Sequence, residues 1–122
     1  MKKILIINDS ALSRGQMRDL FLKNELAECW ESKGEIEAVE KYRMLKPDLA
    51  IITVSNMMDV AVVRKIIDIN QKAKILALGS KGHESYIGEA VQSGALDYII
   101  EPFDEKDLLA TIMKIISCGS EV

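Results

Sequence analysis

The sequence predicts an α/β protein built on a doubly wound parallel sheet of five strands, with helices covering both faces. Short apolar runs alternate with longer segments of helical periodicity five times within 122 residues, which indicates repeated strand–helix units. Four of the five runs consist almost entirely of Ile, Leu, Val and Ala, as is typical of strands buried on both faces. The length predicts one domain over residues 1–122.

The five apolar runs give the predicted strands. The second run is the weakest of the five, because polar residues interrupt it. The intervals that follow the runs carry apolar residues at helical spacing, so each strand is expected to lead into a helix. The predicted strands cover residues 4–7, 26–30, 49–54, 75–78 and 95–100.

Local signals place the ends of the first three helices. Ser10 is expected to cap the first helix, because its side chain can accept a hydrogen bond from the first turn. Gly34 is expected to open the second helix, which must end near Lys46 because Pro47 disfavours helical backbone in the residue before it. The third helix is predicted over about residues 58–70.

The last two helices have clear boundaries as well. Gly94 is expected to end the fourth helix, and the fifth is expected to follow residues 102–104. Residues 117–122 are expected to form a frayed tail. The fifth helix shows the clearest amphipathic stripe of the chain, made of Leu108, Leu109, Ile112, Ile115 and Ile116.

Composition and charge exclude several classes of protein. Apolar residues make up 48% and charged residues 29%, an ordinary balance for a globular domain. Lys and Arg number 16 and Asp and Glu 19, so the net charge of −3 favours neither nucleic acid nor an anionic membrane as a partner. No apolar run approaches the ~20 residues of a membrane helix. Cys29 and Cys118 lack the spacing of metal ligands, and the expected location is the reducing cytoplasm.

The carboxyl ends of the predicted strands are where a functional site is expected. In open parallel sheets, ligands bind outside these ends, at the point where the strand order reverses. Residues 8–10, 53–57, 79–82 and 101–103 should therefore lie close together. The sequence holds no Ser/His/Asp, Cys/His or HExxH arrangement, so we do not expect an independent enzyme.

Five short motifs follow one another along the chain. They are ILIINDS at residues 4–10, AVEKY at 38–42, KPDL at 46–49, AVQSGA at 90–95 and DYIIEPF at 97–103. In this order and at this spacing they resemble the receiver domain of two-component response regulators, and most closely single-domain, CheY-like chemotaxis regulators. The resemblance spans roughly residues 2–117. It implies a flavodoxin-like three-layer sandwich with strand order 2-1-3-4-5 and a cis peptide bond before Pro102.

The resemblance also implies a site for phosphoryl transfer to an aspartate that ends the third strand. In the family, an acidic pair after the first strand holds Mg²⁺, a hydroxyl ends the fourth strand and a lysine ends the fifth. This sequence departs from the pattern at every one of these places. The acidic pair is Asn8 and Asp9, the phosphoacceptor position holds Thr53, the hydroxyl position holds Gly79, and the lysine position holds Glu101.

These departures predict a pseudo-receiver that keeps the fold without the phosphorylation chemistry. Thr53 has no carboxylate and cannot form an acyl phosphate, and Glu101 places an anion where a phosphoryl group would sit. The predicted function is a phosphorylation-independent protein-interaction module in two-component or phosphorelay-type signalling. Neither a cofactor nor Mg²⁺ is expected to bind.

Other interpretations stay open for the same residues. Asp9 and Glu101 could hold a cation or support altered phosphoryl chemistry. In the opposing interpretation, Asp9 caps the first helix and Glu101 accepts hydrogen bonds from Asn8, Thr53 or backbone amides. Thr53 could be the target of a hydroxyl-directed kinase, although the end of a buried strand is a poor position for one. A flavodoxin-like cofactor binder shares the architecture, but the loop at 8–16 has a single glycine and no phosphate-binding cradle.

A signalling protein is expected to dock on the face formed by the fourth helix, the fifth strand and the fifth helix, which is the output surface of the family. Tyr98 matches a mobile aromatic of the family. Because Gly79 has no side chain, we hypothesise that Tyr98 lies permanently inward over the space left there, rather than being an ordinary, partly exposed tyrosine. A homodimer is left open. The residues expected to bind the partner are Tyr86, Ile87, Ala90, Tyr98 and Lys106.

Overall fold

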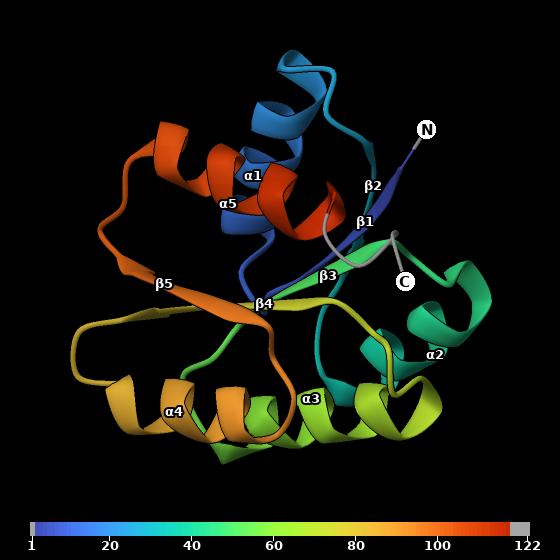
Figure 1. The fold of residues 1–122 in the computed structure, drawn as a ribbon, viewed down its shortest axis with the longest axis vertical. Helices are drawn as coiled ribbons and strands as arrows, with labels where there is room; N and C mark the ends of the chain where they lie inside the picture. The colour runs from blue at the N-terminus through green and yellow to red at the C-terminus, as the bar shows by residue number, and fades with distance from the viewer. Residues whose placement is uncertain (1, 118–122) are drawn as a thin grey trace.

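Five parallel strands alternate with five helices along residues 2–117, the part of the chain that the structure, a computed structural model, describes (Figure 1). The strands are β1 (Lys3–Ile7), β2 (Glu28–Ser32), β3 (Leu49–Thr53), β4 (Ile75–Ser80) and β5 (Asp97–Glu101). The helices that follow them in turn are α1 (Ala11–Lys23), α2 (Glu35–Leu45), α3 (Met57–Ile69), α4 (Glu84–Gln92) and α5 (Glu105–Ser117).

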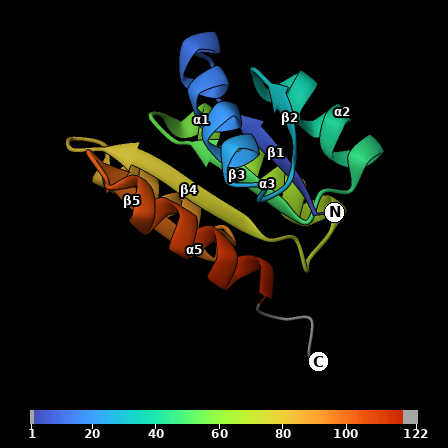
Figure 2. The same ribbon diagram turned by 90° about the horizontal axis from the view of Figure 1, so that it is seen from above.

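The strands form one sheet in the order β2-β1-β3-β4-β5, and each neighbouring pair is parallel. α1 and α5 cover one face of the sheet, and α2, α3 and α4 cover the other (Figures 1 and 2). The chain moves from β1 outward to β2 and then back across β1 to β3, so its direction reverses between β1 and β3. The predicted fold class is confirmed, and so is the strand order that the resemblance implied.

The central strands send alternate side chains into two apolar cores. In β1, Leu5 and Ile7 belong to the core that includes side chains of α2, α3 and α4, whereas Ile4 and Ile6 belong to the core that includes side chains of α1 and α5. β3 and β4 alternate in the same way. Because both faces are covered, these strands need apolar residues at every position, which explains their continuous Ile, Leu, Val and Ala sequences.

The two outer strands are less buried than the central ones. The prediction that residues 95–100 form a strand buried on both faces is wrong, because β5 is an edge strand and Tyr98 is 51% exposed. At the other edge, β2 begins and ends two residues later than the predicted run 26–30, and Trp30 is exposed. A strand at the edge lacks one neighbour, so the helices cover it incompletely.

Helix ends lie close to their predicted positions. Ser10 and Asn56 each accept a hydrogen bond from the backbone N–H three residues later, which caps α1 and α3. Gly34 precedes α2 with φ at 69°, and Lys46 ends it in the left-handed conformation just before Pro47. These caps confirm that Ser10 and Gly34 open their helices.

The fourth and fifth helices end differently from one another. α4 ends before Gly94, whose φ of +127° favours glycine and whose Cβ, if present, would lie 2.7 Å from Ile67 Cγ1. α5 extends through Ser117, so the expectation of a frayed tail is wrong for that residue, and residues 118–122, including Cys118, lie outside the described residues. The peptide bond between Glu101 and Pro102 is cis, as the resemblance implied.

Phe21→Ala tests the core beneath α1. Phe21 is fully buried, so its removal is expected to lower the free energy of unfolding by about 3–5 kcal/mol through lost burial and a residual cavity. Leu22→Ala is the matched control, because Leu22 is 48% exposed and should cost less than about 1 kcal/mol. Urea denaturation followed by circular dichroism measures both. Equal losses for the two variants would contradict this packing.

Candidate functional site

The parallel sheet brings the predicted site residues to one edge. Asn8 and Asp9 follow β1, Thr53 ends β3, Gly79 is the residue before the last in β4, and Glu101 ends β5. Because all five strands run in the same direction, their carboxyl ends meet at this edge. The prediction that these loops lie close together is confirmed. Asn8 contacts Thr53, and the strand register pairs Thr53 with Leu78 and Ser80 with Glu101.

Asn8 and Thr53 form a neutral hydrogen-bonded pair. Asn8 Nδ2 donates to Thr53 Oγ1 at 3.0 Å, while Asn8 Oδ1 accepts from the backbone N–H of Ser10 at 2.8 Å. The amide therefore uses its acceptor at the start of α1 and its donor at the end of β3. In this pair the amide is the donor and the hydroxyl is the acceptor, so neither side chain carries a charge.

Asp9 contacts the residue that precedes α2. Its Oδ1 accepts a hydrogen bond from the backbone N–H of Gly34 at 3.2 Å, and Gly34 is the residue that precedes α2. The interpretation that Asp9 caps the first helix is wrong, because Ser10 caps α1 and Asp9 links the β1–α1 loop to the start of α2. An anion near this helix start is favoured by the helix dipole.

Ile87 fills the space beside Gly79. A Cβ atom built on Gly79 would lie 2.3 Å from Ile87 Cδ1, 2.8 Å from Ile87 Cγ1 and 3.3 Å from the carbonyl oxygen of Val54. The hypothesis that Tyr98 lies inward over Gly79 is wrong, since the Tyr98 side chain is largely exposed. The physical reason is that Ile87, at 3% exposure, already occupies the room next to the glycine.

Glu101 lies half-buried in a cleft of about 310 Å³ between α1 and the segment that joins β5 to α5. Gln16 and Leu20 of α1 form one wall, and Phe103 is on the other side. The hydrogen bonds to Glu101 from Asn8 or Thr53, one of the interpretations left open, are not formed; those two residues bond to each other. Within residues 2–117, no cluster of three or more His, Cys, Asp or Glu side chains could hold a metal ion.

The sequence reasoning missed the part of this cleft that α1 contributes. Ser13, Gln16 and Leu20 line the cleft together with Glu101, although they are about 80 to 90 residues away in the chain. The one signal for them is the helical spacing of Ser13, Gln16 and Leu20, which places them on one side of α1. That spacing does not reveal which element lies opposite, so only the folded chain identifies this wall.

The face formed by α4, β5 and α5 is composed differently from the prediction. Tyr98 and Lys106 are exposed, whereas Ala90 is fully buried and Ile87 contributes only to the wall of a groove of about 390 Å³. The prediction that Ala90 and Ile87 lie on the surface is wrong, because this side of α4 packs on the sheet. Val91 lies four residues after Ile87 and lines the same groove, partly exposed.

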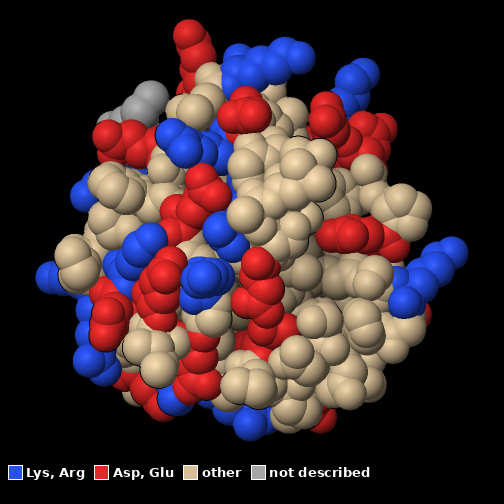
Figure 3. Space-filling model, turned by 180° about the vertical axis from the view of Figure 1, so that it is seen from behind, with Lys and Arg blue, Asp and Glu red and all other residues tan. Residues whose placement is uncertain are grey.

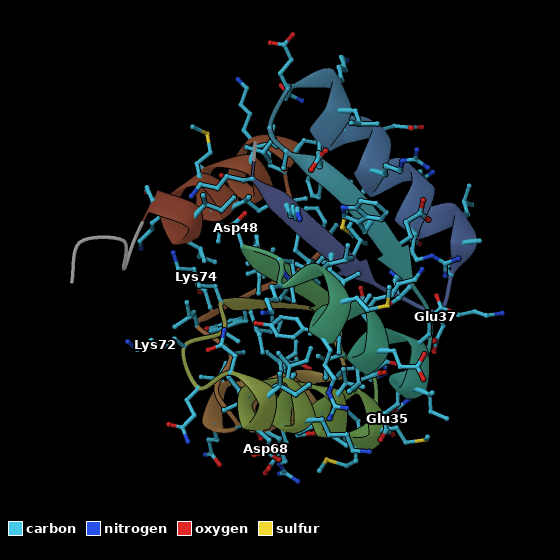
Figure 4. The ribbon with its side chains drawn as sticks, turned by 90° about the vertical axis from the view of Figure 1, so that its right-hand side faces the viewer. Glu35, Glu37, Asp48, Asp68, Lys72 and Lys74 are labelled. Atoms are coloured by element: carbon cyan, nitrogen blue, oxygen red, sulfur yellow. The ribbon has the colours of Figure 1, made fainter. Side chains whose placement is uncertain are left out.

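Charged side chains at the amino-terminal edge of the sheet make contacts that stabilise the fold. Asp48 Oδ2 accepts a hydrogen bond from the backbone N–H of Lys3 at 2.8 Å, which joins the segment before β3 to the start of β1. Lys74 Nζ donates to the carbonyl oxygen of Ile116 at 3.2 Å, near the end of α5. Figure 4 shows Asp48 and Lys74 at this side of the molecule.

The acidic residues that begin α2 are paired with lysines. Glu35 forms an ion pair with Lys65 of α3, and Glu37 forms one with Lys41 at 3.3 Å (Figure 4). The hydrogen bond from the Lys41 side chain lowers the pKa of Glu37 below its usual value, helped by the backbone N–H of Lys33. These ion pairs give Glu35 and Glu37 a structural role. Glu101 has no such ion pair among the described residues.

The charge on the surface is mixed. On the face opposite to that of Figure 1, Lys and Arg are interspersed with Asp and Glu, and neither sign forms a broad area (Figure 3). A polyanion such as nucleic acid favours a continuous basic surface, which this face does not provide. None of the helices within residues 2–117 is both long and apolar enough to cross a membrane.

The fold and the site define a doubly wound α/β domain with the predicted site residues at the carboxyl edge of its parallel sheet. The chain belongs to the response regulator receiver domain family, which matches residues 4–113. It is 32% identical over 116 residues to the chemotaxis protein CheY of Thermotoga maritima, covering 93% of this chain and 97% of that protein. It is also 32% identical over 117 residues to CheY of Bacillus subtilis, covering 94% and 98% of the two chains.

Solved structures share the same fold at lower identity. A response regulator receiver domain protein from Clostridium thermocellum superimposes with a TM-score of 0.86 at 21% identity, covering 96% of this chain and 95% of that one. Chemotaxis protein CheY4 of Vibrio cholerae gives a TM-score of 0.83 at 23% identity, covering 94% and 98%. At these identities the likeness establishes the fold alone.

Gly79→Ala tests the packing at the fourth strand. The new methyl group would overlap Ile87, so the substitution is expected to lower the free energy of unfolding by about 1–3 kcal/mol. In an Ile87→Ala background both overlapping atoms are absent, and the same change should cost at least about 1 kcal/mol less. Denaturant unfolding of the four proteins of this cycle measures the coupling. An unchanged cost in the second background would show that Ile87 is not the obstacle.

Thr53→Val tests the neutral pair at the third strand. The substitution keeps the shape of the side chain but removes the acceptor for Asn8 Nδ2, so it is expected to cost about 1 kcal/mol of unfolding free energy. In an Asn8→Ala background the donor is already gone, and the cost should fall below about 0.5 kcal/mol. Chemical denaturation gives both values. Identical costs in the two backgrounds would rule out a stabilising contact between these side chains.

Proposed function

We propose that this receiver domain acts as a phosphorylation-independent protein-interaction module in two-component or phosphorelay-type signalling. The observation that carries the proposal is the neutral pair of Asn8 and Thr53, 3.0 Å apart, at the place where the resemblance implies an acidic residue and the phosphoacceptor aspartate. A hydroxyl bonded to an amide is uncharged and has no carboxylate that could form an acyl phosphate.

The charge of Glu101 supports the same proposal. Two unit charges 4 Å apart interact by about 4 kcal/mol at an effective dielectric near 20. A glutamate in place of the family's lysine therefore turns an attraction for a phosphoryl group into a repulsion of similar size. With Thr53 and Gly79 at the other two positions, the pocket keeps none of the groups that the family uses on the phosphoryl oxygens.

The proposed partner is a signalling protein that docks on the face formed by α4, β5 and α5. Three exposed apolar side chains favour this face, namely Val91, Tyr98 and Met113, and exposed Lys106 lies at the start of α5. Exposed apolar side chains next to polar ones are typical of protein interfaces. In this proposal the domain acts in the cytoplasm, is not an enzyme and requires no cofactor or Mg²⁺.

The alternative, altered phosphoryl or cation chemistry by Asp9 and Glu101, has less support. Asp9 Oδ1 already accepts a hydrogen bond from the backbone N–H of Gly34, at the start of α2. Mg²⁺ prefers six oxygen ligands, and these two carboxylates lack a third acidic partner among residues 2–117. The experiment below separates this alternative from the proposal.

An amide NMR titration with Mg²⁺, and then with Mg²⁺ and beryllofluoride, tests the proposal. Beryllofluoride mimics a phosphoryl group, and it requires a carboxylate to bind. We expect the amides of Asn8, Thr53, Gly79 and Glu101 to remain unmoved in both steps at millimolar concentrations. Shifts with Mg²⁺ alone would favour a cation site, and shifts only with beryllofluoride would contradict the proposal.

The variant Thr53→Asp/Glu101→Lys is the matched positive control. It returns to this chain the carboxylate and the amine that the family pattern places at positions 53 and 101, in the same fold and with Asp9 retained. We expect its pocket amides to shift with Mg²⁺ and beryllofluoride. A response of the variant shows that the reagents can report on these positions. It also shows that Thr53 and Glu101 are the reason that the amides of the natural sequence do not shift.

A further inference from the structure

A cavity lies between the carboxyl ends of α2 and α3, at the amino-terminal edge of the sheet and so opposite to Asn8 and Thr53. Its volume is about 450 Å³, which is enough for a small organic molecule. Tyr42 and Pro47 are buried and Ile69 is partly buried, so much of the wall is apolar. The residues that line the cavity are Tyr42, Arg43, Lys46, Pro47, Ile69 and Asn70.

The charge at this cavity is positive. Arg43 and Lys46 line it, and no described Asp or Glu side chain does. Within residues 2–117, neither cation forms an ion pair or a side-chain hydrogen bond. The two carboxylates nearest in the chain lie elsewhere, since Asp48 accepts a hydrogen bond from the backbone N–H of Lys3, and Asp68 is exposed on α3 (Figure 4). A chain with a net charge of −3 therefore has a local site that attracts an anion.

A buried hydroxyl supplies a neutral donor at the same place. Tyr42 is 3% exposed, and its Oη accepts a hydrogen bond from Asn70 Nδ2 at 3.3 Å. Asn70 Oδ1 accepts from the backbone N–H of Lys72 at 3.0 Å, so no described residue accepts the Tyr42 proton. Burial raises the pKa of Tyr42, so the phenol keeps this proton at neutral pH. A ligand oxygen in the cavity would satisfy the unused donor.

The cavity favours a singly charged ligand with an apolar body. α2 and α3 both end here, and the carbonyl groups at the end of a helix carry a partial negative charge. That charge opposes a doubly charged phosphate more strongly than a carboxylate. A guanidinium can bind a carboxylate through two parallel hydrogen bonds. Tyr42, Pro47 and Ile69 offer apolar surface to the rest of such a molecule.

We propose that this cavity binds a small carboxylate with an apolar body, with Arg43 and Lys46 beside the carboxylate and the Tyr42 hydroxyl donating to it. The inference goes beyond the proposed function, because it gives the domain a small-molecule ligand at the edge of the sheet opposite to Asn8 and Thr53. In the opposing interpretation, the two cations serve only to stabilise the carboxyl end of α2.

Three small molecules test the charge and the apolar body separately. Benzoate is the probe, benzamide has nearly the same shape without the charge, and acetate has the charge without the ring. Benzoate at millimolar concentration is expected to shift the backbone amides of residues 42–46 and 69–72 in NMR spectra of the full chain. Benzamide is expected to bind about tenfold more weakly, the size of one charge-assisted hydrogen bond. Acetate is expected to lose at least about the same factor, because it buries little apolar surface.

Two variants of equal charge change locate the site. Arg43→Gln removes a cation from the last turn of α2 and is expected to weaken benzoate about tenfold. Lys23→Gln removes a cation from the last turn of α1, outside the cavity, and is expected to leave binding within about twofold. Because each cation lies at a helix end, the loss of its interaction with the helix dipole is matched. Tyr42→Phe keeps the ring and is expected to weaken benzoate about threefold to tenfold.

The other outcomes overturn the proposal. No amide shifts with benzoate would show that the cavity does not accept a carboxylate. Equal weakening by Arg43→Gln and Lys23→Gln would reduce the effect to general charge attraction and would support the helix-end interpretation. Tighter binding of inorganic phosphate at the same amides would assign the cavity to a bare anion. The beryllofluoride titration reports on the opposite edge of the sheet, so the proposed function and this inference can fail separately.

Discussion

The strands β1, β3 and β4 are covered on both faces, and this burial determines most of the structure. Their backbone N–H and C=O groups have no water to bind, so they must pair with the neighbouring strands. Their side chains alternate between two cores, and a shift of one residue would send every side chain to the wrong core. The register is therefore fixed. Asn8 and Thr53, 45 residues apart in the chain, lie within 3.0 Å because the strands that carry them cannot slide.

The pocket at the carboxyl edge depends on this scaffold, whereas the scaffold does not depend on charge in the pocket. An amide and a hydroxyl satisfy each other at the ends of β1 and β3, and Ile87 packs against the backbone at Gly79. The Asp9 side chain accepts a hydrogen bond from the backbone N–H of Gly34, at the start of α2. These contacts are neutral or local, and within residues 2–117 no cluster of three or more acidic, His or Cys side chains accompanies them. Glu101 remains as the charged group of the edge that no described residue satisfies.

The sequence predicted what depends on local pattern and continuous burial. Four apolar runs, the cap at Ser10, the start of α2 after Gly34 and the carboxyl-edge location of Asn8, Thr53, Gly79 and Glu101 followed from it. The failures concern contacts between distant elements. Burial of β5 was overestimated because an apolar run does not reveal which strand lies at the edge. The orientation of Tyr98 depended on Ile87 filling the space at Gly79, and the α1 wall of the cleft depended on α1 and β5 meeting.

The packing of Ile87 against Gly79 also makes the residues that can stand at positions 79 and 87 depend on each other. A hydroxyl-bearing residue at position 79 has no room while the isoleucine is present, whereas a smaller residue at position 87 makes room for it. Making room in this way removes part of a buried side chain, which weakens the core. Ile87 therefore favours glycine at position 79. A side chain can therefore be added at position 79 only together with a change in the core beside it.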